Sequence, residues 1–408
     1  MSFTYLDYAA TTPLSEAVKS TLIETISNQN NFFNAGSSTY EQAEVIANKI
    51  ELARQDIAFT IDVLPREIIF TSGATESNNL AIKGAAFAYK DSGNHIITSK
   101  VEHKAVLDVC HYLETQCFEV TYLDVDSTGN IDIAELKKAI TDRTILISLM
   151  AVNNELGTKN DLYKIGQIAK NHKIIFHVDA AQGYGKIDID IKIMGIDLLS
   201  VSGHKIYGPK GIGFLYVRSK SPRVKLHKQI HGGTQEFSLR AGTLANHQIF
   251  ALATACKEMF EKKIVNYRLV LELRDLFLSK LVGFEVLPLN QGDSLSGSGM
   301  TAVKINTDLE NSYPGILNIT FMGVKAEALL AMLDGICLSM GSACNSEAVQ
   351  PSHVLAAIGL SADEADSTIR VAFGILTTKQ EILVVVKLIN EKIELLKTIS
   401  PYKESAYV

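Results

Sequence analysis

The chain has 408 residues, of which 47% are apolar and 21% are charged, a composition typical of a globular protein rather than a disordered one. Lysine and arginine number 39 against 45 aspartates and glutamates, and the resulting net charge of −6 argues against a nucleic-acid groove or a surface for anionic membranes. The five cysteines have no CxxC spacing, and no uncharged apolar run approaches the ~20 residues that span a bilayer. We therefore expect a cytoplasmic protein without disulfides.

In the first two thirds of the chain, short β-rich apolar runs alternate with segments of helical period. The predicted strands are Glu67–Thr71, His95–Thr98, Glu119–Leu123, Thr144–Met150, Lys173–Val178, Asp197–Val201 and Gly213–Val217. The predicted helices are Tyr40–Ile61, Glu76–Tyr89, Ala134–Ile140 and Leu162–Asn171. This alternation predicts an α/β fold with a mostly parallel seven-stranded sheet flanked by helices on both faces.

The pattern changes near Gln248, where a long helix over Ile249–Lys280 leads into the Gly/Ser-rich stretch Asn290–Gly299, which is typical of a loop. Three further elements follow and indicate a smaller C-terminal α/β domain: a strand near Gly315–Phe321 and helices over Ala326–Leu333 and Gln380–Ile399. We predict a large domain over residues 14–256, with residues 1–13 and 257–408 forming the small domain.

Two neighbouring strands of the predicted sheet end in polar side chains. Lys173–Val178 runs into Asp179, and Asp197–Val201 runs into Ser202, Gly203, His204 and Lys205. Ligands of open parallel sheets bind at the carboxyl ends of the strands, and a lysine opposite a carboxylate is the pair that pyridoxal phosphate requires. The plainer alternative is that Asp179 caps a helix and Lys205 is a solvated charge. For either residue taken alone, that alternative is favoured.

A third segment indicates a phosphate site at the same edge. The strand Glu67–Thr71 leads through Ser72 and Gly73 into a helix, so the backbone N–H groups of the first helical turn point toward the edge of the sheet. The hydroxyls of Ser72 and Thr75 add donors. An ordinary Ser/Thr cap at a helix start is the competing interpretation of this segment.

Together these segments resemble the cysteine desulfurases, in the class V aminotransferase group of fold-type I pyridoxal-phosphate enzymes. The motifs that carry the resemblance are collinear over nearly the whole chain. They are LDYAATTP (6–13), FTSGATESNN (70–79), EHKAV (102–106), VNNELG (152–157), HVDAAQ (177–182), SGHKIYGPKG (202–211), RAGT (240–243), GSAC (341–344) and IRVAFG (369–374).

The resemblance implies a role for each matching position. Lys205 would form the Schiff base with the cofactor, Asp179 would pair with the pyridine nitrogen, Gln182 would bind the phenolic oxygen, and His103 would stack on the ring and assist catalysis. Other matching residues would hold the cofactor and its phosphate: Ala74, Thr75, Asn154, Ser202, His204 and, from the second subunit of a homodimer, Thr243. Asn154 and Arg370 would bind the substrate carboxylate.

The cysteines divide into one candidate nucleophile and several core residues. Cys344 lies in a run of small residues without apolar period, as suits a mobile, exposed thiol that accepts sulfur. Cys337, by contrast, we expect to be buried in a strand or a helix. Cys110 and Cys117 lie near His111, but adjacent positions on a helix point to different faces, so we expect buried core cysteines and no metal site.

The implied activity is conversion of L-cysteine to L-alanine, with the sulfur held as a persulfide on Cys344 and passed to a sulfur-acceptor protein of iron–sulfur assembly or a thiolation pathway. Alternatives remain: another class V aminotransferase or a selenocysteine lyase, a non-catalytic platform, and a nicotinamide dehydrogenase, although GxGxxG does not follow the first strand. The sequence departs from the family at Tyr40, where histidine is usual, at Thr234, and in a long segment over Leu287–Thr307.

Overall fold

The computed structural model describes residues 3–281, 284–287, 301–340 and 352–399. Seven strands form the larger sheet, in the order β2-β8-β7-β6-β5-β3-β4. Their bounds are β2 Ile68–Thr71, β3 His95–Ser99, β4 Glu119–Leu123, β5 Thr144–Met150, β6 Ile175–Asp179, β7 Leu198–Ser202 and β8 Gly213–Val217. Each predicted strand is therefore present, with ends that differ by at most two residues.

One strand of the larger sheet runs against the others. β8 pairs antiparallel with both β2 and β7, whereas the pairs β7–β6, β6–β5, β5–β3 and β3–β4 are parallel. The carboxyl ends of β2, β3, β5, β6 and β7 consequently lie at one edge, and only β8 begins there. The predicted mostly parallel sheet is confirmed, and its carboxyl edge is where the candidate site lies.

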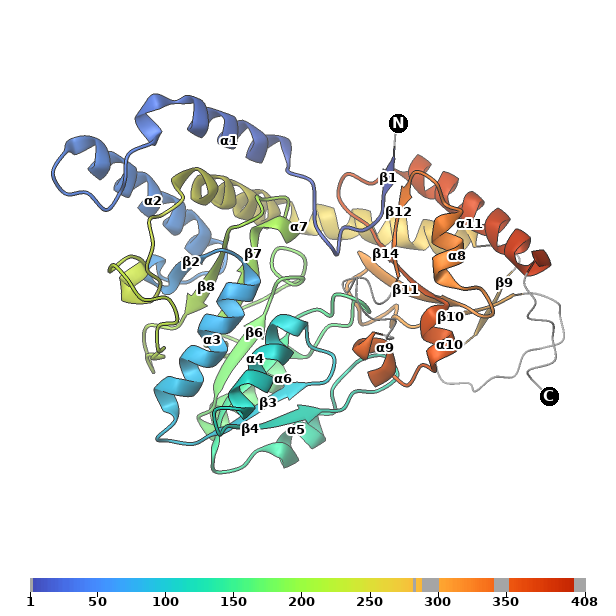
Figure 1. Cartoon of the computed structure of the whole chain (residues 1–408), viewed down its shortest axis with the longest axis horizontal. Coiled ribbons are helices and arrows are strands. Elements are labelled where there is room, and N and C mark those ends of the chain that lie inside the picture. The colour runs from blue at the N-terminus through green and yellow to red at the C-terminus, as the bar shows by residue number, and fades with distance from the viewer. Residues whose placement is uncertain (1–2, 282–283, 288–300, 341–351, 400–408) are drawn as a thin grey trace.

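Helices cover both faces of this sheet (Figure 1). Side chains of α3 (Ala74–Tyr89) and α4 (Lys104–Glu114) form one buried cluster with Leu146 of β5, and the next residue, Ile147, belongs to the cluster on the opposite face. Such alternation is the rule for a strand, and it explains why every residue of β5 is buried. The remaining helices of this part are α1 Glu16–Ser27, α2 Glu41–Phe59, α5 Ile133–Ala139 and α6 Leu162–His172.

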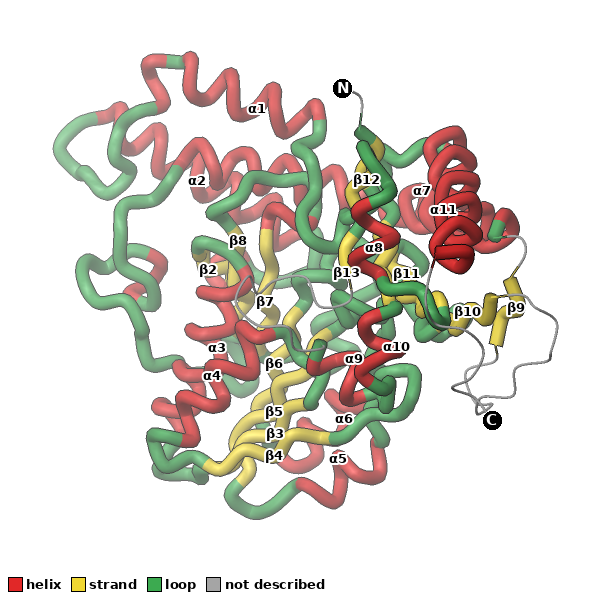
Figure 2. Tube along the Cα trace, turned by 45° about the vertical axis from the view of Figure 1, so that its right-hand side comes forward, coloured by secondary structure: helices red, strands yellow, loops and turns green. Residues whose placement is uncertain are grey.

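The long helix α7 (Asn246–Lys280) connects the larger sheet to a smaller α/β part (Figures 1 and 2). Its five strands have the order β13-β14-β11-β10-β9 and form a sheet beside which β1 pairs with β12. Their bounds are β1 Thr4–Tyr5, β9 Phe284–Leu287, β10 Thr301–Ile305, β11 Ile316–Phe321, β12 Ile336–Cys337, β13 Ser339–Met340 and β14 Thr368–Ala372. The helices are α8 Ala326–Ala331, α9 His353–Ala357, α10 Ala362–Asp366 and α11 Lys379–Ile399.

The smaller α/β part confirms that a second sheet follows α7, but the exact domain limits stay a prediction. One cluster of buried apolar side chains extends from Ile46 of α2 through Phe176 of β6 to Val371 of β14, so the two parts share a continuous core. In the part of the chain that the structure describes, no helix has the length and apolar character that crossing a membrane requires.

Within the larger part, a buried ion pair ties α2 to the segment that precedes α7. Arg54 of α2 donates two hydrogen bonds of 2.8 Å to the carboxylate of Glu236, and both side chains are almost wholly buried. Glu236 also accepts from the backbone N–H of Phe70 in β2. Glu236, Phe237 and Ser238 all have positive φ angles, a strained conformation for these residues that this pairing fixes in place.

We expect Arg54→Met to lower the free energy of unfolding by about 3–5 kcal/mol, because it leaves the carboxylate of Glu236 buried without its cation. Urea unfolding followed by circular dichroism measures this. The matched control is Lys138→Met, which removes an exposed partner of Glu135 and should have a much smaller effect on the free energy of unfolding. Equal effects of the two substitutions would contradict the assignment.

Candidate active site

The candidate site is built where β6, β7 and α3 meet at the carboxyl edge of the larger sheet. β6 ends at Asp179, and β7 ends at Ser202, from which a single 3₁₀ turn, η3 (Gly203–Lys205), leads to Lys205. Because Asp179 pairs with Ser200 across the two strands, the carboxylate and the lysine leave the sheet side by side. The structure thus brings together the two residues that the sequence singled out.

Asp179 is buried and held in one orientation. Its Oδ2 accepts a hydrogen bond of 2.7 Å from Nδ2 of Asn78 in α3, and its Oδ1 accepts from the backbone N–H of Ala181 at 2.9 Å. The bond from Ala181 is the contact expected if Asp179 only capped a helix. The bond from Asn78 of α3 is an additional contact across the edge of the sheet. Oδ1 of Asn78 is buried and has no partner within the described residues.

The amine of Lys205 is held by the N-terminal segment, which crosses the edge of the sheet. Nζ donates to the backbone carbonyl oxygens of Ala9 and Ala10, at 2.6 and 2.7 Å. The same segment is attached to η3 through Thr12, whose N–H donates to the carbonyl of His204. The motif 6–13 does not reveal this role in the sequence, because the contact with Lys205 is made by backbone carbonyls and not by side chains.

The start of α3 has the features of a phosphate site. Its N-cap is Gly73, which has no side chain to occupy the N–H groups of the first turn and has a φ of +143° that disfavours other residues. A Cβ atom at Gly73 would lie 3.3 Å from Oγ of Ser202, so that hydroxyl stands directly beside the helix start, with Ala74 and Thr75 in the first turn. Three predicted phosphate ligands therefore converge here.

His204 and His103 flank the site as neutral side chains. Burial, with the positive charges of Lys205, Lys210 and Lys186, lowers the pKa of His204 to about 4, and its Nδ1 contacts the hydroxyl of Thr11. His103 is the N-cap of α4, and its Nδ1 accepts from the N–H of Ala105, which leaves Nε2 to exchange a proton.

Partial burial and the positive charge of Lys205 lower the pKa of His103, and the carboxylate of Asp179 opposes this shift. Its neighbour Glu102 is buried, and this raises the pKa of Glu102 to about 8. That carboxyl group accepts from the N–H of Met150 and the hydroxyl of Ser99, so the loop that carries His103 is fixed to β5 and β3.

Arg370 of β14 is buried at the junction of the two sheets and is no surface ion pair. It donates to Oδ1 of Asp7 at 2.7 Å, to the backbone carbonyl of Asn154 at 2.9 Å and to Oγ of Ser339 at 3.2 Å. Its Nε is buried and has no partner in the described chain. This N–H of the guanidinium could therefore bind a further acceptor, and Asn154, whose carbonyl accepts from Arg370, is half-buried.

Of the remaining predicted site residues, Gln182 is joined to this set through the carbonyl of Ala9, whereas no hydrogen bond joins Thr243 to it within the described residues. Thr243 is exposed, three residues beyond Arg240, which donates to Glu76 in the first turn of α3. Gln182 is buried in the turn after β6 and donates to the carbonyl of Ala9. Cys344 lies outside the described residues, as do the loop predicted over Asn290–Gly299 and most of the segment 287–307.

Two of the predictions for cysteines are wrong. Cys110 is buried in α4 as expected, but Cys117 is exposed in the turn after that helix, with a φ of +66°. Cys337 lies in a strand, β12, but is exposed rather than buried. Tyr40, at the start of α2, packs its ring 5.8 Å from that of Phe33.

Comparison with known proteins assigns the family. The pattern of the family "Aminotransferase class-V" matches residues 4–267 and 294–385. Curated relatives named "Cysteine desulfurase IscS" are 45% identical over 400 residues in Colwellia psychrerythraea and 47% identical over 403 residues in Neisseria meningitidis serogroup C. The alignments cover 98% of this chain and 95% and 94% of those proteins. The chain belongs to the class V aminotransferases, and among them to the cysteine desulfurases.

Solved structures agree with this assignment. A "NIFS-like protein" matches with a TM-score of 0.85 and 32% identity, over 97% of this chain and all of that one. A structure titled "SspA in complex with cysteine" matches with a TM-score of 0.78 and 37% identity, over 92% of this chain and all of that one. The predicted family, fold class, enzyme class and cofactor, pyridoxal phosphate, are confirmed.

The residues at the edge of the sheet fit pyridoxal phosphate. An uncapped helix start beside the hydroxyl of Ser202 suits the phosphate, the fixed carboxylate of Asp179 suits the pyridine nitrogen, and the amine of Lys205 lies on the neighbouring turn. A glycine at position 73 is required by this cradle, since a larger residue would fill the space next to Ser202.

The sheet below the site contains a buried histidine, His177 of β6, two residues before Asp179. Its Nδ1 contacts Oγ of Ser148 and its Nε2 contacts Oγ of Ser200, at 2.8 and 2.9 Å, so it joins β5, β6 and β7. Burial lowers the pKa of His177 to about 3. Between this value and about 6.5 the unfolded chain binds a proton that the folded protein does not.

Stability should therefore fall as the pH is lowered from about 6.5 toward 3, and His177→Gln should reduce this slope by up to about 1.4 kcal/mol per pH unit. Urea unfolding at several pH values measures the slope. His172→Gln is the control, since that side chain is exposed, and its slope should equal that of the unsubstituted protein. An unchanged slope in His177→Gln would show that this imidazole is protonated when folded.

Proposed function

We propose that this cysteine desulfurase converts L-cysteine to L-alanine and transfers the sulfur to Cys344 as a persulfide. The observation that carries the proposal is the placement of Lys205, Asp179 and the uncapped start of α3 at one edge of the sheet, within reach of Arg370 at the junction with the small sheet. When bound there, pyridoxal phosphate supplies an electron sink for the substrate carbons.

The residues of the chain divide the remaining work. Lys205 would hold the cofactor through its amine, and the same Nζ would take the proton from the substrate Cα. Asp179 pairs with the pyridine nitrogen, Gln182 donates to the phenolic oxygen, and His103 stacks on the ring and moves protons through Nε2, since its Nδ1 is occupied. The phosphate is held by the start of α3 at Ala74 and Thr75, by Ser202 and His204, and by Thr243 of the second subunit.

The substrate carboxylate binds to Arg370 and Asn154. Nε of Arg370 is the buried donor that has no partner in the described chain, and burial makes a charge-assisted bond to a carboxylate strong. Asp7 holds the other side of the guanidinium, so the arginine is oriented before the substrate arrives.

Sulfur transfer needs the thiolate of Cys344. Its Sγ attacks the substrate sulfur and forms an S–S bond, while the Cβ–S bond of the substrate breaks and leaves its electron pair on the carbon fragment. That fragment takes up protons and departs as alanine. The persulfide then passes its outer sulfur to an acceptor protein, for which we propose an iron–sulfur assembly scaffold or a thiolation enzyme.

We expect Cys344→Ala to abolish persulfide formation and reduce alanine release from L-cysteine by at least about 100-fold, while the visible absorbance of the cofactor stays unchanged. Alkylation of the persulfide followed by mass spectrometry, together with an alanine assay, measures both. Cys117→Ala is the matched control, because Cys117 is exposed and lies in the turn after α4, and it should behave as the unsubstituted protein.

Two outcomes would refute this assignment. One is a persulfide in Cys344→Ala at the normal level. The other is turnover of L-cysteine by Lys205→Ala, which lacks the amine that carries the cofactor.

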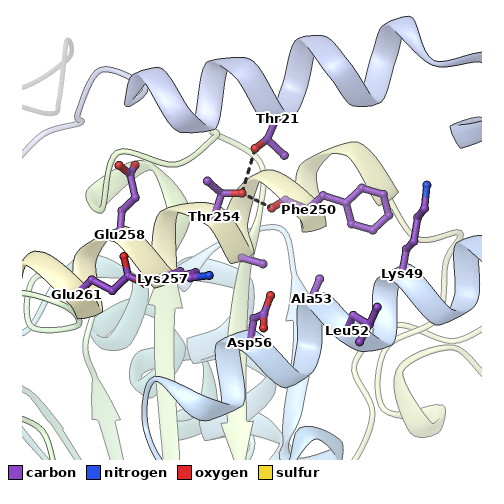
Figure 3. Close-up of a pocket in the computed structure, with 11 residues that line it drawn as sticks. Thr21, Lys49, Leu52, Ala53, Asp56, Phe250, Thr254, Lys257, Glu258 and Glu261 are labelled. Atoms are coloured by element: carbon purple, nitrogen blue, oxygen red, sulfur yellow. Dashed lines mark hydrogen bonds between the residues drawn. The ribbon is translucent and has the colours of Figure 1, made fainter.

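We also propose a homodimer that buries the outer side of α1, α2 and α7. These helices pack against one another and present large apolar side chains that are each at least 65% exposed: Ile23, Ile26, Phe59, Ile264 and Val265. Between the helices lies a groove of about 470 Å³, lined by Thr21, Leu52, Phe250 and neighbouring charged residues (Figure 3). Apolar exposure of this extent is typical of a protein interface.

Sedimentation equilibrium should give twice the mass of one chain, and the double variant Phe59→Glu/Ile264→Glu should shift the equilibrium toward monomer by at least about tenfold in dissociation constant. Leu395→Glu, on the exposed side of α11, is the control and should leave the dimer intact. A monomer at micromolar concentration for the unsubstituted protein would refute the dimer.

A further inference from the structure

Lys186, to which neither the motifs nor the proposed mechanism assigns a role, is a buried lysine next to the site. It lies at the end of the turn that follows β6 and is 8% exposed. No ion pair with a carboxylate is present for it among the described residues, and its polar contacts are Oε1 of Gln182 and the ring face of Tyr313, 5.7 Å away. A buried ammonium without a carboxylate is costly, so its position requires an explanation.

The contact between Lys186 and Gln182 determines how the Gln182 amide is oriented. Nζ of Lys186 donates to Oε1 of Gln182 at 2.7 Å, and Nε2 of Gln182 donates to the carbonyl oxygen of Ala9 at 2.7 Å. An ammonium offers only donors, so a reversed amide would place its NH₂ group against another donor and lose both bonds. Lys186 thus keeps the amide NH₂ of Gln182 on the side of Ala9.

That side is the one on which Lys205 lies. The carbonyl oxygen of Ala9 accepts from both Gln182 and Lys205, the latter at 2.6 Å. A continuous path of hydrogen bonds therefore runs from Lys186 through Gln182 and Ala9 to Lys205. Burial and, to a smaller extent, the charge of Lys205 lower the pKa of Lys186 to about 7, so the ammonium, which only donates, predominates below that pH.

The surroundings of Lys186 hold this arrangement rigid. A small cavity between the two sheets is lined by Gln182, Lys186, Tyr8, Tyr207 and Tyr313. Within the turn, the N–H of Lys186 donates to the carbonyl of Gly183, which packs so closely against Ala151 that a Cβ atom there would lie 2.7 Å from that side chain. Gln182 and Lys186 are four residues apart in this turn, in which Gly185 has a φ of +71°, and the turn brings their side chains into contact.

We propose that Lys186 is a positioning residue for the desulfurase reaction: its ammonium locks the side-chain amide of Gln182 so that the NH₂ group faces the phenolic oxygen of the cofactor held by Lys205. The proposal rests on the function proposed above for Gln182. Because the amide has a second N–H beyond the one bound to Ala9, it can hold the backbone and the cofactor at once. Lys186 itself contacts neither substrate nor cofactor.

The test is a double-mutant cycle on the full-length protein reconstituted with pyridoxal phosphate. Lys186→Met should raise the dissociation constant of pyridoxal phosphate about tenfold and shift the visible absorbance band, because the amide of Gln182 becomes free to reverse. Gln182→Ala should produce a loss of similar size. The double variant should be no worse than Gln182→Ala alone, since Lys186 acts through that residue.

Two controls keep the outcome interpretable. Lys192→Met removes one positive charge from the same segment between β6 and β7. Lys192 is exposed and pairs with Asp62, so this variant should leave the dissociation constant of pyridoxal phosphate and the absorbance band unchanged. Circular dichroism confirms that each variant is folded. If Lys186→Met fails to fold, Lys186→Gln replaces it, because a neutral amide at this position accepts Gln182 in either orientation and predicts the same losses.

Each result has a distinct meaning. Normal cofactor affinity and absorbance in a folded Lys186→Met, or losses that multiply with those of Gln182→Ala, would overturn the positioning role and leave the proposed function intact. Gln182→Ala with normal affinity and absorbance would instead overturn the role proposed for Gln182, and with it this inference. Losses in both single variants without further loss in the double variant support the inference.

Discussion

The arrangement of the site depends on the backbone of residues 7–12, which crosses the carboxyl edge of the larger sheet. Its carbonyl oxygens at Ala9 and Ala10 hold the amine of Lys205, and the carbonyl of Ala9 also holds Gln182. At one end Asp7 pairs with Arg370 of the smaller sheet, and at the other Thr12 is bonded to the turn that carries Lys205. This one segment therefore fixes the residues proposed to bind the cofactor and the substrate relative to each other, although they come from different sheets.

Buried polar groups surround that segment, and each is costly unless its partners are in place. Asp179, Glu102 and His177 all have at least two hydrogen-bond contacts, which offset the loss of water around them. Among the buried atoms that lack a partner in the described chain are Nε of Arg370, Oδ1 of Asn78 and Oε2 of Glu102. Others, such as Oγ of Ser312, belong to residues without a proposed role in the site, so a missing partner alone does not mark a ligand-binding group.

Much of the fold could be predicted, because its strands are short apolar runs between strongly periodic helices. The bounds predicted for the strand Thr144–Met150 are those of β5. Burial on both faces makes every position of this strand apolar except Thr144 and Ser148. The antiparallel direction of β8 was not predictable from local pattern, because strand direction depends on how the connecting chain packs. Likewise β1, β12 and β13 have two residues each, too few for any period to appear.

The sequence by itself determined the family and the chemistry, because Lys205, Asp179, the glycine turn before α3 and the collinear motifs are identities that need no coordinates. Tertiary structure decided what those identities contact. The exposure of Cys117 and Cys337, the backbone carbonyls that hold Lys205, and the burial of Lys186 against Gln182 all depend on segments brought together by packing. The hydrophobic pattern of one segment indicates which of its side chains face the core, whereas such contacts depend on which distant segment lies opposite.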